Sequence, residues 1–327
     1  MSAATEKPRL VVLVGPTGAG KTAMAVDLAG RWHAEIVSAD SMQVYRGMDI
    51  GTAKPSREIQ RTVPHHLIDV VDPDEPFDAS RYLVLAREAV DRLRKGGTPV
   101  FVVGGTGLYI RALLGGLIHG PGADEALRRT LKDEMKRFGK EHLYEKLRLR
   151  DAWAAARIHP HDGIRIIRAL EVLELTGRSI VEHQEGHRFQ ERPYEVLKIG
   201  LAPERGTLQA RIAARTDAMI AAGFVDEVRQ LLARGYDGSL KPMQSLGYRH
   251  ILAHLAGKVD LDGAVEGIKR DTYRYAKRQK TWFAADPEIL WIAPEDADEA
   301  AGRIAPFLAG DRWDRGAHEE AGPRRAS

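Results

Sequence analysis

The sequence predicts an α/β fold in which helices flank a parallel sheet, with an all-helical insertion. Short apolar runs rich in valine and isoleucine alternate with helical patterns early in the chain, as in parallel β-α-β units. The first run, residues 10–14, leads straight into a glycine-rich loop and a helical run. From about residue 121 to 192 strand-like runs vanish, and helices dense with arginine and lysine replace them.

The glycine-rich loop has the pattern Gly15-x-x-x-x-Gly20-Lys21-Thr22. Its glycines let successive backbone N–H groups turn toward an anion, and the following helix points its positive end at the same anion. In this pattern Lys21 gives a point charge to phosphate oxygens and the Thr22 hydroxyl is placed to bind Mg²⁺. The loop predicts a P-loop NTPase-like sheet that binds a polyphosphate, without saying which one.

Further apolar and periodic stretches predict the other elements in order. Strands are expected at residues 35–38, 64–71, 99–103, 196–201 and 289–292. Long helices are expected from Ser80 to the Gly96-Gly97 pair, over residues 204–222, and from Asp262 to about Phe283.

Two polar residues follow apolar strands of the expected sheet. Asp40 comes after the strand at 35–38, and Thr106 follows the strand at 99–103. Ligands of parallel α/β sheets bind at the carboxyl ends of the strands. We therefore expect both side chains on the edge that carries the phosphate loop.

The basic helical segment, residues 121–192, is predicted to be an insertion in the α/β core. Asp124 and Asp162 are placed to cap its helices, and Gly177 follows the end of the second one. The expected organisation is a P-loop core in residues 1–120, the helical insertion in 121–192, the rest of the core with C-terminal helices in 193–309, and a disordered tail in 310–327.

Composition excludes several classes of protein. The 327 residues contain no cysteine, so disulfides, thiol catalysis and cysteine-based zinc sites are absent. The polar N-terminus and the short apolar run behind it fit neither a signal peptide nor a membrane span. A cytoplasmic protein without a membrane partner is expected, and nothing demands more than a monomer. The net charge of +3 says little about a nucleic-acid partner.

Two candidate site residues have structural alternatives. Asp40 is either a general base or a Mg²⁺ contact through water, or it caps a turn, as Asp-Ser pairs do. Arg215 falls on the apolar stripe of its helix, where an unpaired guanidinium is costly. It therefore binds an anion or belongs to a buried structural ion pair.

Cations and aromatic residues alternate in the last long helix. Tyr273, Tyr275 and Trp282 lie among six cations. Asp271 is the only acidic residue in this run of the sequence. The run is either a solvated face or an RNA-binding surface, because aromatic rings beside phosphate-binding cations suit RNA. The six cations are Lys269, Arg270, Arg274, Lys277, Arg278 and Lys280.

Seven blocks, in this order, give the chain a resemblance to the tRNA dimethylallyltransferases (isopentenylpyrophosphate transferases) up to about residue 295. They are residues 15–22 (GPTGAGKT), 38–45 (SADSMQVY), 49–55 (DIGTAKP), 64–69 (PHHLID), 104–109 (GGTGLY), 168–171 (RALE) and 276–279 (AKRQ). A phosphate loop alone would be a weak signal, whereas these blocks together are specific.

The resemblance implies a P-loop enzyme that uses Mg²⁺. It would transfer the dimethylallyl group of dimethylallyl diphosphate to the exocyclic amine of the adenosine 3′ of the anticodon. Asp40 would accept the proton of that amine. The implied catalytic residues are Asp40, Thr17, Lys21 and Arg215, and Thr22 is the implied metal ligand. The implied diphosphate-binding residues are Gly15, Pro16, Thr17, Gly18, Ala19, Gly20, Lys21 and Thr22.

The resemblance also implies that the basic insertion holds the anticodon stem-loop of the tRNA. A single-stranded loop base is easily extruded into an active site. The expected tRNA-binding residues are Asp40, Ser41, Met42, Gln43, Thr106, Arg128, Ile164, Arg165, Ile166, Ile167, Arg168, Arg249, Lys277 and Arg278.

Three other functions share some of these features. A nucleoside or nucleotide kinase has the same loop and sheet but does not need the basic insertion. An enzyme that prenylates free adenine nucleotides would accept AMP in place of tRNA. A regulatory RNA-binding NTPase would bind tRNA without dimethylallyl diphosphate.

Overall fold

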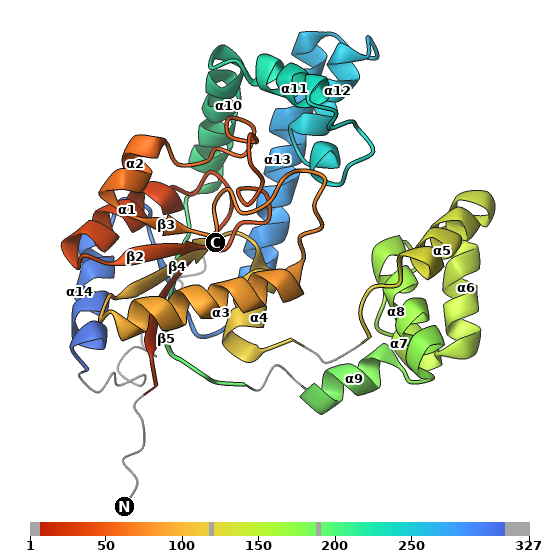
Figure 1. Ribbon diagram of the computed structural model, residues 1–327, viewed down its shortest axis with the longest axis horizontal. Helices are drawn as coiled ribbons and strands as arrows, with labels where there is room; N and C mark the ends of the chain where they lie inside the picture. The colour runs from red at the N-terminus through yellow and green to blue at the C-terminus, as the bar shows by residue number, and fades with distance from the viewer. Residues whose placement is uncertain (1–6, 118–120, 188–190, 311–327) are drawn as a thin grey trace, which may run out of the picture. The chain divides into compact units, whose positions relative to one another are not determined.

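The structure is a computed structural model that describes residues 7–117, 121–187 and 191–310 (Figure 1). Its contacts divide the chain into two units, Met1–Leu113 with Pro193–Ser327, and Leu114–Arg192. The disorder expected for the tail concerns residues that, from 311 onward, lie outside the described ones. Within the described ranges no helix is long and apolar enough to cross a membrane.

The first unit is built on a six-stranded sheet in the order β3-β2-β4-β1-β5-β6, and every pairing in it is parallel. The predicted parallel α/β fold is confirmed. Val14, the last residue of β1, lies opposite Gly104 in β4 and Gly200 in β5, so these strands end at one edge. The strands are β1 (Arg9–Val14), β2 (Glu35–Ser38), β3 (His65–His66), β4 (Val100–Gly104), β5 (Glu195–Leu201) and β6 (Ile289–Ile292).

The central strand β1 is buried from Leu10 to Val14. Alternate side chains, such as Val11 and Leu13, pack into an apolar core with the helices α1 (Lys21–Arg31) and α14 (Ala297–Ala309). Helix α3 (Ala79–Lys95) contacts β2 and β4. The phosphate loop begins at the end of β1. Because β1 is buried, the core holds the start of this loop in place.

The first unit also contains helices between and after the strands. Helix α13 contacts both α10 and α12, and it runs for 24 residues. The elements are α2 (Arg57–Thr62), α4 (Gly107–Gly115), α10 (Arg205–Ala221), α11 (Phe224–Ala233), the short 3₁₀ helix η1 (Pro242–Gln244), α12 (Tyr248–Leu255) and α13 (Leu261–Ala284).

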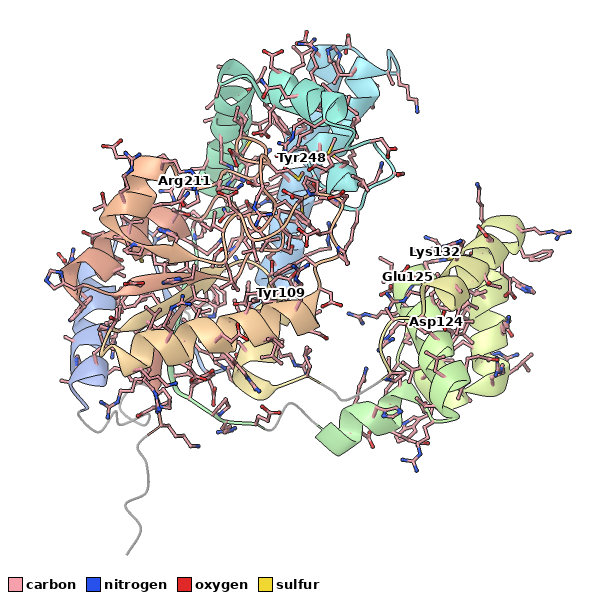
Figure 2. The ribbon with its side chains drawn as sticks, viewed as in Figure 1. Tyr109, Asp124, Glu125, Lys132, Arg211 and Tyr248 are labelled. Carbon is pink, nitrogen blue, oxygen red and sulfur yellow. The ribbon has the colours of Figure 1, made fainter. Side chains whose placement is uncertain are left out.

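The second unit is helical, and the expected caps are present in it. The Asp124 side chain, labelled in Figure 2, accepts a hydrogen bond from the Leu127 N–H, and Asp162 accepts one from the Arg165 N–H. Gly177 ends its helix with a left-handed φ of 67°. The helices are α5 (Glu125–Phe138), α6 (Lys140–Arg150), α7 (Ala152–Ala155), α8 (Gly163–Thr176) and α9 (Ile180–His187).

The strand expected at 64–71 is wrong, because only two of its residues, His65 and His66, form β3. Leu67 and Asp69 have positive φ values of 63° and 56°, which a strand does not allow. The following backbone turns to the loop after β2 instead, where the Asp69 and Val70 N–H groups donate to the carbonyls of Gln43 and Val44.

Two expected helix starts are also wrong. Asp78, not Ser80, caps α3, because its carboxylate accepts both the Ser80 and Arg81 N–H groups. Asp260, not Asp262, caps α13 through the Gly263 N–H. In both helices an acidic residue two positions earlier binds the free N–H groups of the first turn.

A buried carboxylate organises the second unit. The side chain of Glu171 has no exposed surface and accepts hydrogen bonds from Arg128, Arg168 and the Asp124 N–H. Burial alone would raise the pKa of Glu171, but the hydrogen bonds from Arg168 and Arg128 outweigh it and lower that pKa. Glu171 thereby joins the start of α5 to the middle of α8.

We predict that Glu171→Leu loosens the helical unit, because it removes the buried acceptor shared by two guanidinium groups and one N–H. Both arginines reach solvent, so we expect a cost of about 2 kcal/mol, a roughly 30-fold faster amide exchange in α8. Hydrogen exchange measures this. Glu174→Gln is the matched control, because Glu174 lies on the same helix, α8, and pairs at the surface with Arg150 of α6. Equal exchange in the two variants would contradict the role of Glu171.

Candidate active site

The phosphate loop links β1 to α1 with no side-chain cap on the helix. Gly18 and Gly20 have left-handed φ values of 82° and 94°, which favour glycine. Gly20 is the residue before α1, and among the described residues no side chain caps the first N–H groups of that helix. These N–H groups and the helix dipole suit an anion.

The Lys21 side chain is hydrogen-bonded to the backbone of the phosphate loop. Its Nζ donates to the carbonyl oxygens of Gly15 and Pro16, both at 2.9 Å. Burial lowers the pKa of Lys21 to about 8, although the charge of Asp40 opposes the shift and that of Arg215 adds to it. This pKa is close to physiological pH, so neighbouring charges can change the protonation of Lys21.

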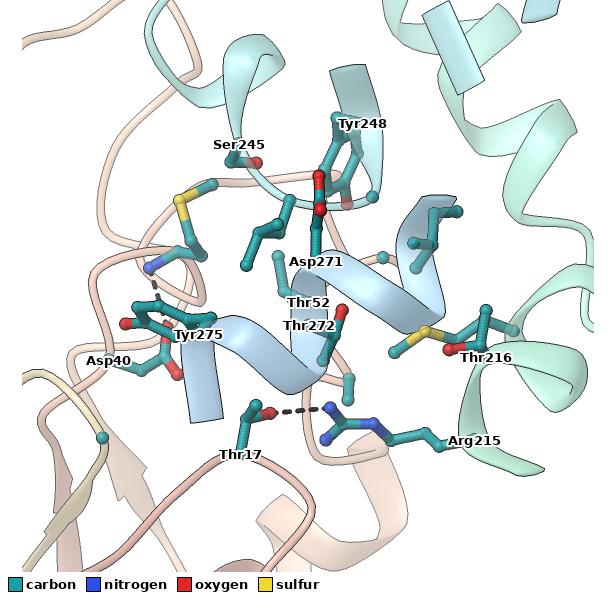
Figure 3. Close-up of a pocket in the computed structure, with 18 of the residues that line it drawn as sticks. Thr17, Asp40, Thr52, Arg215, Thr216, Ser245, Tyr248, Asp271, Thr272 and Tyr275 are labelled. Carbon is teal, nitrogen blue, oxygen red and sulfur yellow. Dashed lines mark hydrogen bonds between the residues drawn. The ribbon is translucent and has the colours of Figure 1, made fainter. Parts of the chain in front are cut away.

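Arg215 reaches the loop from α10. Its Nη2 donates to the Thr17 hydroxyl at 2.6 Å, the bond drawn dashed between Thr17 and Arg215 in Figure 3. Burial lowers the pKa of Arg215, and the Asp40 charge partly offsets this. Within the described part of the chain Arg215 forms no ion pair, so the structural ion pair that the sequence allowed is not seen. Thr17, Lys21, Asp40 and Arg215 all line one cavity of about 640 Å³.

Asp40 forms the turn cap that the sequence allowed. Its Oδ1 accepts hydrogen bonds from the Met42 N–H at 2.8 Å and the Gln43 N–H at 3.3 Å, so it caps a turn. Its Oδ2 accepts no hydrogen bond from the described residues. Because Asp40 lines the cavity beside the phosphate loop (Figure 3), the cap fixes the carboxylate and leaves one oxygen for other contacts.

Thr106 lies next to Asp40, as expected for neighbouring strands of a parallel sheet. Its hydroxyl accepts the Ser41 N–H at 3.1 Å, and its own N–H donates to the Ala39 carbonyl at 3.1 Å. A Cβ on Gly104 would lie 2.2 Å from that same carbonyl oxygen. Close approach of the two strand ends therefore requires glycine at 104.

A buried carboxylate that the sequence did not single out fixes another wall of the cavity. Glu227 accepts the N–H groups of Asp49, Ile50 and Gly51 at 2.6–3.1 Å, and the Tyr248 hydroxyl at 2.7 Å. Gly51 and Tyr248 both line the cavity. No local pattern indicates this contact, because Glu227 lies 176–178 positions from the loop.

The expected tRNA-binding residues of the insertion differ in exposure. Ile166 and Ile167 belong to the core of the helical unit, and Arg128 and Arg168 bind Glu171. At the start of α8, Ile164 is 84% exposed and Arg165 is exposed. Of this group, Ile164 and Arg165 are the residues that solvent reaches most freely.

The cations of the last helix have more partners than Asp271. Lys269 pairs with Asp217 and Glu266, which corrects the expectation of a single opposing acid. Asp271 binds Arg249, His250, Arg270 and Arg274. Lys277 and Arg278 are exposed and lie over the rings of Tyr273 and Tyr275, at 5.0 and 5.7 Å. Arg249 and Arg278 also line the cavity.

A phosphate loop, two half-buried cations and a carboxylate around one cavity are the features of a P-loop protein whose site suits a polyphosphate. The family model described as IPP transferase matches residues 43–286. The chain therefore belongs to the IPP transferase family.

Named relatives match nearly end to end. The chain is 58% identical to tRNA dimethylallyltransferase 2 of Syntrophus aciditrophicus, over 95% of this chain and 100% of that protein. It is 54% identical to tRNA dimethylallyltransferase of Geobacter metallireducens, over 88% and 93%. The solved tRNA isopentenylpyrophosphate transferase of Bacillus halodurans is 40% identical and superposes with a TM-score of 0.70, over 93% of this chain and 97% of that one.

We predict that inorganic pyrophosphate binds with uptake of a proton by Lys21. The pKa of Lys21 is about 8, and a bound anion raises it, so the group is more protonated in the complex than in the free protein above pH 8. Affinity should fall as the pH rises past 8. Calorimetry at about pH 8.5 in buffers of different ionisation enthalpy measures the uptake. Equal proton uptake by a Lys21→Met variant would contradict the assignment.

Proposed function

We propose that the protein transfers a dimethylallyl group from dimethylallyl diphosphate to the exocyclic amine of the adenosine 3′ of the anticodon in tRNA. The observation that carries the proposal is the placement of the Asp40 carboxylate and the phosphate loop around one cavity. A chain of the IPP transferase family needs both: a cradle for the leaving group and an acceptor for the proton.

In this proposal the diphosphate lies in the phosphate loop. The loop N–H groups, Lys21 and Arg215 neutralise the charge that develops as the bond between carbon and the diphosphate oxygen breaks. Thr17, held by Arg215 at 2.6 Å, adds a hydroxyl to the same wall. Donors that are already fixed pay no reorganisation cost during the reaction.

Asp40 accepts the proton of the attacking amine. The lone pair of an exocyclic adenine amine is delocalised into the ring, so the amine is a weak nucleophile and needs a base. The nitrogen forms a bond to the first carbon of the dimethylallyl group, diphosphate departs with the bonding electrons, and the proton passes to Asp40. Because the capping bonds use Oδ1, the proton would go to Oδ2.

Mg²⁺ is the proposed cofactor. Some of its ligands would come from the protein and others from the diphosphate of the substrate. Among the described residues no group of three or more histidine, aspartate or glutamate side chains could hold a metal ion. Mg²⁺ commonly binds through substrate phosphates, waters and one or two protein groups. Thr22, which lines a second cavity with Lys21 and Asp40, would hold it, and the ion would supply further positive charge to the diphosphate.

The proposed acceptor is a base taken out of the anticodon loop. Arg249 and Arg278, at the cavity, are positioned to bind phosphates near such a base, and Ile164 with Arg165 on α8 would contact the RNA through the insertion. Because tRNA is the substrate, we expect the protein to act in the cytoplasm.

Mass spectrometry tests the proposed reaction directly. Unmodified tRNA incubated with the protein, Mg²⁺ and dimethylallyl diphosphate should gain one dimethylallyl group at the adenosine 3′ of the anticodon, and the reaction should leave added ATP intact. AMP in place of tRNA should stay unmodified. Prenylated AMP would favour the nucleotide-prenylating alternative, and phosphorylation of an acceptor by ATP would favour a kinase. Unmodified tRNA under these conditions would contradict the proposal.

A further inference from the structure

One buried amide connects the two loops of the site. Gln279 lies on α13 and is 7% exposed. Its Oε1 accepts the Thr17 N–H of the phosphate loop at 2.8 Å, and its Nε2 donates to the Gly105 carbonyl after β4 at 2.8 Å. The partners lie 262 and 174 positions away in sequence, so α13 joins two strand ends through one side chain.

Both the chemistry and the space at this point select an amide. The side chain must accept a hydrogen bond on one side and donate one on the other, which a carboxylate or an alkyl group cannot do. A Cβ on Gly105 would lie 2.3 Å from Nε2 of Gln279, so the loop fits against the amide only without a side chain.

Each contact of Gln279 continues into one half of the site. Thr17, whose N–H binds the amide, receives the Arg215 bond through its hydroxyl. Gly105 precedes Thr106, whose hydroxyl accepts the Ser41 N–H, and Ser41 follows Asp40. The first route leads to the phosphate cradle and the second to the carboxylate.

We propose that Gln279 is a positioning residue that sets the phosphate loop and the Asp40 turn in register with each other. The inference rests on the proposed function, in which the diphosphate lies in the loop and the amine approaches Asp40. A displacement reaction needs the nucleophile, the carbon and the leaving group aligned, and misplacement by about 1 Å can cost on the order of 100-fold in rate. Gln279 is the described side chain that bonds to both loops.

The first variant removes both hydrogen bonds and keeps the bulk. Gln279→Leu should lower kcat by roughly 10- to 100-fold, while KM for tRNA changes less than about threefold, since the amide is buried and hydrogen-bonds to the two loops. Affinity for inorganic pyrophosphate should fall, because the phosphate loop loses the hydrogen bond that holds Thr17 in place. Thermal unfolding checks that the variant folds. Wild-type kcat and pyrophosphate affinity in a folded variant would overturn the proposal.

A second variant uses pH to restore the lost donor. In Gln279→Glu the ionised carboxylate still accepts from Thr17 but repels the Gly105 carbonyl, whereas the protonated acid donates to that carbonyl. Its kcat relative to the parent should therefore rise as the pH falls from about 8 to 6. Gln244→Glu is the matched control, since Gln244 lines the same cavity and its side chain hydrogen-bonds to the Gly238 carbonyl. A constant ratio in Gln279→Glu, or an equal recovery in the control, would overturn the proposal.

Failure of the proposed function is separable from failure of this inference. If the parent protein does not prenylate tRNA, the reaction assignment fails, and pyrophosphate affinity alone then decides the role of Gln279. If the parent prenylates tRNA and both Gln279 variants match it in kcat, pH response and pyrophosphate affinity, the positioning role fails while the function stands.

Discussion

Parallel pairing around β1 is the constraint on which the site depends. Val14 ends β1 opposite Gly104 and Gly200, so the loops that leave these strands meet at one edge. The buried core beneath β1 holds that edge in place. The phosphate loop, the Asp40 turn and the Thr106 loop are neighbours because the strands before them pair in register, and the helices α10 and α13 then bring Arg215 and Gln279 to the same edge.

Sequence predicted the parts of this site whose signals are local. A loop of fixed spacing between strand and helix placed Lys21 and Thr22, and the carboxyl ends of parallel strands placed Asp40 and Thr106. Aspartate caps at 124 and 162 were also local, since each binds an N–H three residues away. The helices expected to begin at Ser80 and Asp262 have their caps at Asp78 and Asp260, each two positions earlier.

The contacts that hold the site together could not be predicted in this way. Gln279 and Glu227 bind backbone groups more than 170 positions away, and a single buried polar residue leaves no periodic pattern. Charge was equally uninformative in the insertion: Arg165 and Arg168 look alike in the sequence, yet one is exposed and the other binds the buried Glu171. These contacts could not be predicted because the partners lie far apart in the sequence, and not because the fold is irregular.

The most direct measurement of the account is the kinetics of Asp40→Asn. Asparagine caps turns about as well as aspartate, so the bonds from the Met42 and Gln43 N–H groups should survive while the proton acceptor is lost. The account predicts that kcat falls by roughly two to four decades with KM for tRNA and for dimethylallyl diphosphate nearly unchanged. A folded variant that turns over within a few-fold of the parent would contradict it.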